Sequence, residues 1–403
     1  MIAATTAPAQ QQAFTSLPRR FEQGGVVALF GLAASVQFSI AVSQSLLAVA
    51  VLCWLGLLVT GRERLQVPRF FWPLIAYAAA TLIAAAFSSN PRLSFLDCKQ
   101  LVLFLVVPIT YRFATARGAN LLLTLVMTVG AASAAYGIFQ YGLLHYDQLS
   151  QRPQGTLGHY MTYSGLLMLV IGIAIAKLLF SRDERVWPAL VMPALVLAVA
   201  LTSTRTAWVG VCAGAGVLLV LKDFRLLAVL PVAGAITFAA AGPAITQRLM
   251  STFDSKDPTR RDRIAMLREG AHMVSDHPWV GIGPNMVEQR YAEYRVPEAV
   301  QAVNPHLHNV PMQIAAERGL PALALWLSFI GILGFDLARA VRAQRMSALS
   351  AAALAALVSM LAAGMFEYNF GDSEFLMLFL LLITLPFAAL RLTTAPPQTP
   401  GAH

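Results

Sequence analysis

The stretch YSGLLMLVIGIAIAKLLF, residues 163–180, decides the fold class, because it carries one charged residue in a long apolar run. An α-helix needs about 20 mainly apolar residues to cross the hydrocarbon core of a membrane. The whole chain shares this character, with 57% hydrophobic and 12% charged residues over 403 positions. A single soluble core cannot bury so much apolar surface. The sequence therefore predicts an all-α polytopic membrane protein.

Windows of this kind recur along the chain and predict about twelve transmembrane helices. They cover residues 25–42, 44–60, 70–88, 99–115, 119–142, 163–180, 187–203, 207–221, 226–242, 320–338, 348–366 and 375–391.

The basic residues between these windows predict the orientation of the chain. Cytoplasmic segments of membrane proteins are enriched in Lys and Arg. With a cytoplasmic N-terminus, the short outer loops hold only Arg92, Lys99, Arg152 and Arg205. The inner segments hold many more, namely Arg19, Arg20, Arg62, Arg64, Arg69, Arg112, Arg117, Arg182, Arg185, Lys222, Arg225, Arg339, Arg342, Arg345 and Arg391. An even number of spans then places both termini in the cytoplasm.

One long polar segment, residues 243–319, lies on the outer side in this topology. Within it, Asp257 and Pro258 resemble a helix N-cap and first helical position, and residues 258–275 have helical periodicity. Ile264, Leu267, Ala271 and Val274 form the apolar face expected for this amphipathic helix. The predicted organisation is a cytoplasmic tail at 1–24, spans at 25–242, an outer catalytic loop at 243–319, spans at 320–391 and a disordered cytoplasmic tail at 392–403.

Two arginines on the outer side are candidate anion ligands. Arg205 lies in LTSTRTAWVG between two spans, and Arg263 begins the second turn of the predicted loop helix. A guanidinium binds phosphate bidentately and keeps its charge. The alternatives are a snorkelling side chain for Arg205 and a solvated basic face for Arg260, Arg261 and Arg268. Arg268 lies five residues after Arg263 and should point elsewhere.

NPHLHNVPMQIAAERGLP, residues 304–321, offers a candidate base. His308 precedes Asn309, a favoured helix N-cap residue, and Gly319 with Pro321 predicts a break before the next span. The positive end of the helix dipole disfavours an imidazolium, which keeps the ring neutral and able to accept a proton. A structural histidine is one alternative. Half of a metal site, His306-x-His308, is another, although no carboxylate follows at short spacing.

Several function classes are disfavoured by what the sequence lacks. No P-loop, kinase motifs or DxD-type carboxylate pair is present, so metal-dependent nucleotide-sugar chemistry is disfavoured. The net charge of +9 does not form a separate basic domain, so no nucleic-acid partner is expected. The three cysteines form no CxxC or Cys/His cluster. No cofactor and no metal are expected.

These motifs resemble those of a known family, the O-antigen ligase and polymerase superfamily, and most closely those of the lipopolysaccharide O-antigen ligases. The family signature is His, then Asn, Ser or Gln, nine residues and Gly, which is similar to His308, Asn309 and Gly319 here. Ala322 departs from the Gly, Thr or Tyr that often follows. RIAMLREGAHMVSDHPWVGIGPN (263–285), STRTAW (203–208) and RPQGTLGHYMTYSG (152–165) resemble further family segments.

The resemblance implies a metal-independent, membrane-embedded glycosyltransferase of the GT-C type in the bacterial inner membrane, with a periplasmic active site. The donor would be O-antigen linked to undecaprenyl pyrophosphate, and the acceptor a sugar hydroxyl of the lipid A–core oligosaccharide; membrane lipids surround the enzyme. His308 would be the general base, and Arg205 and Arg263 would bind pyrophosphate. Arg152, His306, Asn309 and Arg318 would position substrates.

Three other functions stay open from the sequence. An O-antigen polymerase or a protein O-oligosaccharyltransferase would use the same donor. A transporter would be expected to show broken helices in matching halves of the chain, and no such pair is visible. The sequence leaves open the sugars, their linkage, the stereochemistry and the oligomeric state.

Overall fold

The computed structural model describes residues 7–60, 65–148, 150–181, 183–240, 258–342 and 347–391. These residues form helices and no strand. Within them, seven helices are long and apolar enough to cross a membrane, by length and composition. The all-helical membrane fold is therefore as predicted, whereas the count of twelve spans and the outer position of the loop stay predictions.

The helices of the first half cover most of the predicted windows. They are α1 (Ala7–Ser35), α2 (Ile40–Val59), α3 (Phe71–Ala86), α4 (Pro91–Asp97), the 3-10 helix η1 (Cys98–Leu105), α5 (Val106–Phe113), α6 (Ala116–Leu143), α7 (Tyr160–Phe180), α8 (Val186–Leu201), α9 (Arg205–Lys222), the 3-10 helix η2 (Phe224–Ala228) and α10 (Val229–Ala240).

The second half supplies the loop helices and the last spans. They are α12 (Pro258–Asp276), α13 (Val287–Tyr294), α14 (Val310–Arg342), α15 (Ala348–Gly364), the 3-10 turn η3 (Asn369–Gly371) and α16 (Ser373–Arg391).

Three predicted boundaries differ from the structure. Helix α1 ends at Ser35, so the predicted window 25–42 runs too far; the Ser39 hydroxyl accepts the backbone N–H of Val42 and begins α2 there. The predicted window 99–115 is not one regular helix, because η1 separates α4 from α5. Helix α1 also begins at Ala7, inside the predicted tail at 1–24.

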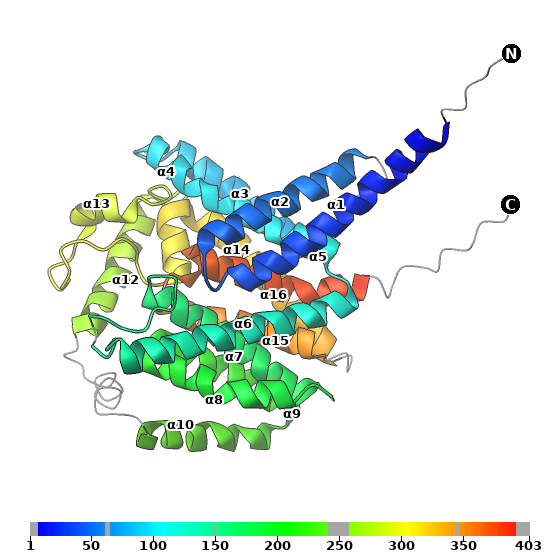
Figure 1. The fold of residues 1–403 in the computed structure, drawn as a ribbon. Coiled ribbons are helices and arrows are strands. Elements are labelled where there is room, and N and C mark those ends of the chain that lie inside the picture. The colour runs from blue at the N-terminus through cyan, green and yellow to red at the C-terminus, as the bar shows by residue number, and fades with distance from the viewer. Residues whose placement is uncertain are drawn as a thin grey trace, which may run out of the picture.

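The centre of the bundle is formed by α7 and α16, whose apolar windows are 72% and 78% buried. Helix α15 packs against α7, α9 and α16, and α14 packs against α3. In Figure 1, α12 and α13 lie at one end of the bundle, and the first turns of α1 and the last turn of α16 lie at the other. The loop helices therefore cover the end away from both terminal helices.

Helix α12 forms where it was predicted, and the face that it packs against the protein is not its apolar face. Ile264 and Leu267 are exposed, and the buried face instead includes Asp262, Met266 and Glu269. This face is buried because its carboxylates accept hydrogen bonds from the loop backbone. Asp262 accepts from the N–H groups of residues 300 and 301 at 2.9 and 3.0 Å, and Glu269 accepts from the N–H group of residue 296 at 3.1 Å. These bonds pair N–H groups of the loop that are not paired within a helix or a sheet. The predicted cap at residue 257 and residues 243–256 of the loop lie outside the described residues.

Candidate functional site

The N-terminus of α14 presents His308 as predicted. Asn309 is the N-cap: its Oδ1 accepts the backbone N–H of Met312 at 2.9 Å. The Asn309 amide nitrogen donates to the Met365 carbonyl at 3.0 Å, which ties the cap to the turn between α15 and α16. His308 itself has φ 47°, a left-handed conformation that is uncommon for residues other than glycine and that clusters at functional sites.

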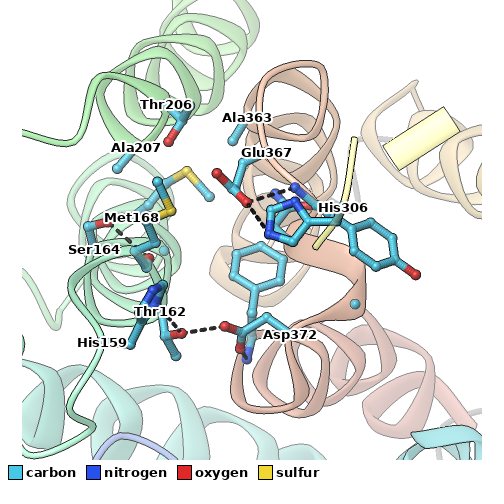
Figure 2. A pocket seen from close by; sticks show the side chains of 16 residues that line it. His159, Thr162, Ser164, Met168, Thr206, Ala207, His306, Ala363, Glu367 and Asp372 are labelled. Carbon is cyan, nitrogen blue, oxygen red and sulfur yellow. Dashed lines mark hydrogen bonds and ion pairs between the residues drawn. The ribbon is translucent and has the colours of Figure 1, made fainter. Parts of the chain in front are cut away.

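Glu367, in the turn between α15 and α16, joins the two histidines. Its Oε2 lies 2.9 Å from His308 Nδ1, and its Oε1 lies 3.7 Å from His306 Nε2. The two imidazole rings meet edge to face with centroids 4.1 Å apart. Figure 2 shows the Glu367 carboxylate beside the His306 ring. A carboxylate on Nδ1 fixes the tautomer of His308 and leaves Nε2 to accept a proton.

The charges of this trio follow from burial and contact. Burial raises the pKa of the Glu367 carboxyl, but the hydrogen bond and charge of His308, with His306 and Arg263, outweigh it and lower the pKa to about 2. Burial and the neighbouring His308 lower the pKa of His306 to about 4. Near neutral pH, Glu367 is therefore an anion and His306 a neutral ring.

The same trio is the cluster in the described residues that has the geometry of a metal site. His306, His308 and Glu367 offer ligand atoms that all lie within 4.8 Å of one another. Two imidazoles and a carboxylate are a donor set that suits Zn²⁺. The carboxylate that the sequence lacks at short spacing is thus supplied by the fold, from 59 residues away. The geometry permits a metal and equally permits a His–Glu pair.

Helix α14 breaks nine residues after its first residue, and the break is sealed by the turn at 277–285. Gly319 has φ 80° and ψ 170°. The carbonyls of Ala316 and Glu317 accept the backbone N–H groups of Ile282 and Gly283, each at 2.9 Å. A Cβ on Gly319 would lie 2.3 Å from the Trp279 carbonyl oxygen. The glycine is therefore required by both its conformation and its close approach to the turn.

Arg205 is the first residue of α9, after a tight turn in which Ser203 has φ 53°. The backbone N–H groups in the first turn of a helix are unpaired within the helix and carry the positive end of its dipole. Arg205 therefore adds a guanidinium to a place that already favours anions. Its side chain lines two pockets of the protein.

These two pockets bring the predicted arginines together. The histidine pocket, of about 350 Å³, is lined by His308 and Asn309 of α14, Arg205 and Thr206 of α9, and Arg260 and Arg263 of α12, with Leu307, Thr259, Val209, Ile264, Leu267, Met365 and Phe366. The arginine pocket, of about 170 Å³, is lined by Arg152, Arg205 and Arg263 with Tyr160, Met161, Ser203, Thr204, Thr206 and Thr259.

Both pockets share Arg205, Arg263 and Thr206, so they adjoin. The Arg152 guanidinium stacks on the Tyr160 ring, with its carbon 4.2 Å from the ring centroid. Arg268, expected to point away from Arg263, is 57% exposed and pairs with Glu298. Three chain segments that are distant in sequence therefore place guanidinium groups around one space.

Arg318 lies elsewhere. It is buried, donates to Glu317 at 2.6 Å and lies 3.6 Å from the Asp97 carboxylate. With Tyr77, Asp97 and Tyr368 it lines a small separate pocket of about 20 Å³. The ring centroids of Tyr368 and His306 lie 6.1 Å apart, so Tyr368 stands between Arg318 and the histidines. Arg318 lines neither the histidine pocket nor the arginine pocket.

Another pocket, which we call the acidic pocket, contains residues that sequence reasoning missed. It has a volume of about 200 Å³ and is lined by His306, Glu367 and Asp372 together with His159, Met161, Thr162, Ser164, Gly165, Met168, Thr206, Ala207, Ala363, Tyr368, Asn369, Gly371 and Phe375. Glu367 and Asp372 lie between the last two predicted spans, on the same predicted side as the long loop. With Glu374, this short outer turn holds three acids, a signal that could have been used.

Comparison with known proteins agrees with the resemblance found in the sequence. A family model described as O-antigen ligase matches residues 189–327, a range that includes Arg205, Arg263, His306, His308 and Arg318. No curated protein matches the chain. The match confirms the expected similarity to the O-antigen ligases for this part of the chain; Arg152 and Glu367 lie outside it.

Proposed function

We propose that this protein is a glycosyltransferase that ligates O-antigen from undecaprenyl pyrophosphate to a sugar hydroxyl of lipid A–core oligosaccharide. The observation that carries the proposal is the convergence of Arg152, Arg205 and Arg263 on a space that adjoins His308. The family match supports an O-antigen ligase type of membrane enzyme. The donor, the acceptor and the GT-C classification come from the resemblance.

His308 is the proposed general base. Its Nδ1 is engaged by Glu367 at 2.9 Å, so Nε2 accepts the proton of the acceptor hydroxyl. The hydroxyl oxygen then attacks the anomeric carbon, a new C–O bond forms, and the bond from that carbon to the pyrophosphate oxygen breaks. Glu367 stabilises the imidazolium that results, in the way that a carboxylate orients a histidine in other base-assisted transfers.

The arginines are the proposed clamp for the leaving group. Charge develops on the pyrophosphate as the glycosidic bond breaks, and preorganised cations stabilise such charge without reorganising. Arg205 and Arg263 line both adjoining pockets and are assigned to the pyrophosphate; Arg152 lines the arginine pocket and is assigned to positioning. Guanidinium groups offer fixed pairs of donors, which suits phosphate oxygens. In this scheme arginines supply the charge that a divalent metal supplies elsewhere.

The proposed location is the bacterial inner membrane, with a periplasmic active site and cytoplasmic termini. The basic residues of the short connections support it. The arrangement in Figure 1 is consistent with it, because α12 lies at the end away from the first turns of α1 and the last turn of α16. Asn309 is assigned to holding the turn that carries Glu367, through its bond to Met365, and His306 and Arg318 to supporting the same turn.

The decisive experiment mixes the purified protein with lipid-linked O-antigen and lipid A–core in EDTA. Transfer to the core is the expected result. Growth of lipid-linked chains would instead identify a polymerase, and transfer only to an added protein acceptor a protein O-oligosaccharyltransferase. Absence of product in all pools would overturn the proposal in favour of a transporter. Activity that appears only when Zn²⁺ replaces EDTA would overturn the metal-independent scheme and assign the metal to His306, His308 and Glu367.

His308→Ala is the matching variant. It should insert and fold but leave lipid A–core without O-antigen in cells, whereas Arg268→Gln, on the same helix as Arg263 but outside the pockets, should cap the core normally. Normal capping by His308→Ala would remove the base assignment.

A further inference from the structure

The acidic pocket has no role in the proposed glycosyl transfer, yet it lies next to the two pockets assigned to that reaction. Glu367 lines this pocket and also binds His308, which lines the histidine pocket. Thr206 lines all three pockets. Figure 2 shows Glu367 and His306 on one side of the space, Asp372 and Thr162 on another, and Thr206 with Ala207 at a third. The pocket therefore adjoins the site: it shares Thr206 with both other pockets and Met161 with the arginine pocket, and its Glu367 contacts His308.

Its polar groups are built into the fold. The Thr162 hydroxyl donates to Asp372 Oδ2, and His159 Nδ1 lies 3.4 Å from the same hydroxyl. Asp372 Oδ1 accepts the backbone N–H of Phe375 at 2.9 Å and so caps α16. These contacts hold the Asp372 carboxylate in one orientation at the edge of the pocket, with the start of α7 facing the start of α16.

Two other polar atoms in the wall have no hydrogen-bond partner among the described residues. Asn369, only 8% exposed, donates from its amide nitrogen to the Met360 carbonyl at 3.2 Å, but its Oδ1 is buried and unpaired. His306 Nδ1 is also buried and unpaired. Because buried polar atoms in folded proteins are almost always hydrogen-bonded, such atoms beside a cavity indicate a missing partner. A ligand with hydroxyl groups supplies both donors and acceptors.

The remaining wall is apolar. Phe375 and Met168 contribute large faces, and Ala207, Ala363 and Gly165 keep the space open. A sugar ring is complementary to such a pocket, because it has hydroxyl groups at its rim and an apolar face of C–H groups. A volume of about 200 Å³ is enough for a sugar ring.

The charge of the pocket is opposite to that of its neighbours. Glu367 and Asp372 place two carboxylates here, whereas the adjoining pockets are lined by Arg152, Arg205 and Arg263. A phosphate or an acidic sugar would be repelled by the carboxylates and attracted by the arginines. The arginine-lined pockets therefore favour a pyrophosphate, and the acidic pocket favours an uncharged ring.

We propose that the acidic pocket is a carbohydrate subsite that binds one uncharged sugar ring next to the reacting centre. The proposal rests on the proposed glycosyl transfer and extends it by separating the pyrophosphate site from a sugar site. Thr162, Asp372 and Asn369 are the binding residues. The ring comes either from the acceptor oligosaccharide or from the first residue of the donor glycan, and these two sources share the same chemistry.

Equilibrium binding to the purified full-length protein tests the subsite without requiring turnover. The probes are lipid A–core, lipid-linked glycan, and undecaprenyl pyrophosphate without glycan. Asp372→Asn keeps the helix cap and removes the charge, and Thr162→Val keeps the shape and removes the hydroxyl. We expect each variant to raise the Kd of one glycan-bearing probe about tenfold, the range for a lost hydrogen bond to a charged group, and to leave the Kd of undecaprenyl pyrophosphate unchanged.

The outcomes separate the sources and the possible failures. A higher Kd for lipid A–core assigns the ring to the acceptor, and a higher Kd for lipid-linked glycan assigns it to the donor. Unchanged affinities for both, or equal weakening of all three probes, would overturn the subsite. Arg268→Gln, a change on α12 at a residue that lines none of the three pockets, should change none of them. If the wild type binds glycan through this pocket but transfers none, the transferase proposal fails while the subsite stands.

Discussion

The substitution Glu367→Gln probes the part of the site that ordinary sequence motifs do not show. Glutamine keeps the length of the side chain and can still accept a hydrogen bond from His308 Nδ1, now 2.9 Å from Oε2. It removes the negative charge that stabilises an imidazolium during transfer. The change therefore isolates charge from shape.

The expected loss follows from the type of bond. A hydrogen bond to a charged group contributes about 1.5–3 kcal/mol and a neutral one about 0.5–1.5 kcal/mol, so the charge alone contributes about 1–1.5 kcal/mol. At about 1.4 kcal/mol for each factor of ten, this corresponds to roughly 5- to 12-fold in kcat. The contribution appears in the transition state, where His308 gains its proton, so kcat should fall while the KM for the donor stays within about twofold.

The assay is steady-state transfer from lipid-linked glycan to lipid A–core, measured over a range of pH. Glu374→Gln serves as the control in the same turn. Wild-type kcat in Glu367→Gln would refute the reasoning, and a rise in donor KM alone would make Glu367 a binding residue.

Three further outcomes are expected. Arg263→Gln should lower kcat/KM by roughly 10- to 150-fold through a lost charged hydrogen bond, whereas Arg268→Gln should stay within about twofold in the same transfer assay; equal losses would show that only surface charge matters. Gly319→Ala should lower the Tm in detergent, because φ 80° and a contact of 2.3 Å to the Trp279 carbonyl leave no space for a Cβ; an unchanged Tm would show that the break in α14 does not require glycine. The pKa of His306 is lowered from 6.5 to about 4 in the folded protein, so as the pH falls the unfolded chain binds this proton first. The free energy of unfolding should therefore be highest above pH 6.5 and should fall as the pH drops to about 4, by at most about 3 kcal/mol. Unfolding at several pH values, with His306→Gln as the variant that loses this dependence, measures it.

The sequence by itself determined the features that depend on neighbouring residues. Apolar runs predicted the helices, Pro258 the start of α12, Asn309 the cap of α14, and Gly319 its break, and the structure has each of them. These features are local, because a cap, a break or a run long enough to span a membrane is decided by residues within a few turns.

Only the tertiary structure decided which side chains meet. The carboxylate on His308 comes from Glu367, and the Asp372 partner of Thr162 comes from 210 residues further along the chain. The burial of Asp262 on α12 has a related cause: its carboxylate pairs with the backbone of residues 300 and 301, which hydropathy does not report. Such pairings depend on how helices pack, and periodicity within one helix carries no information about its partner.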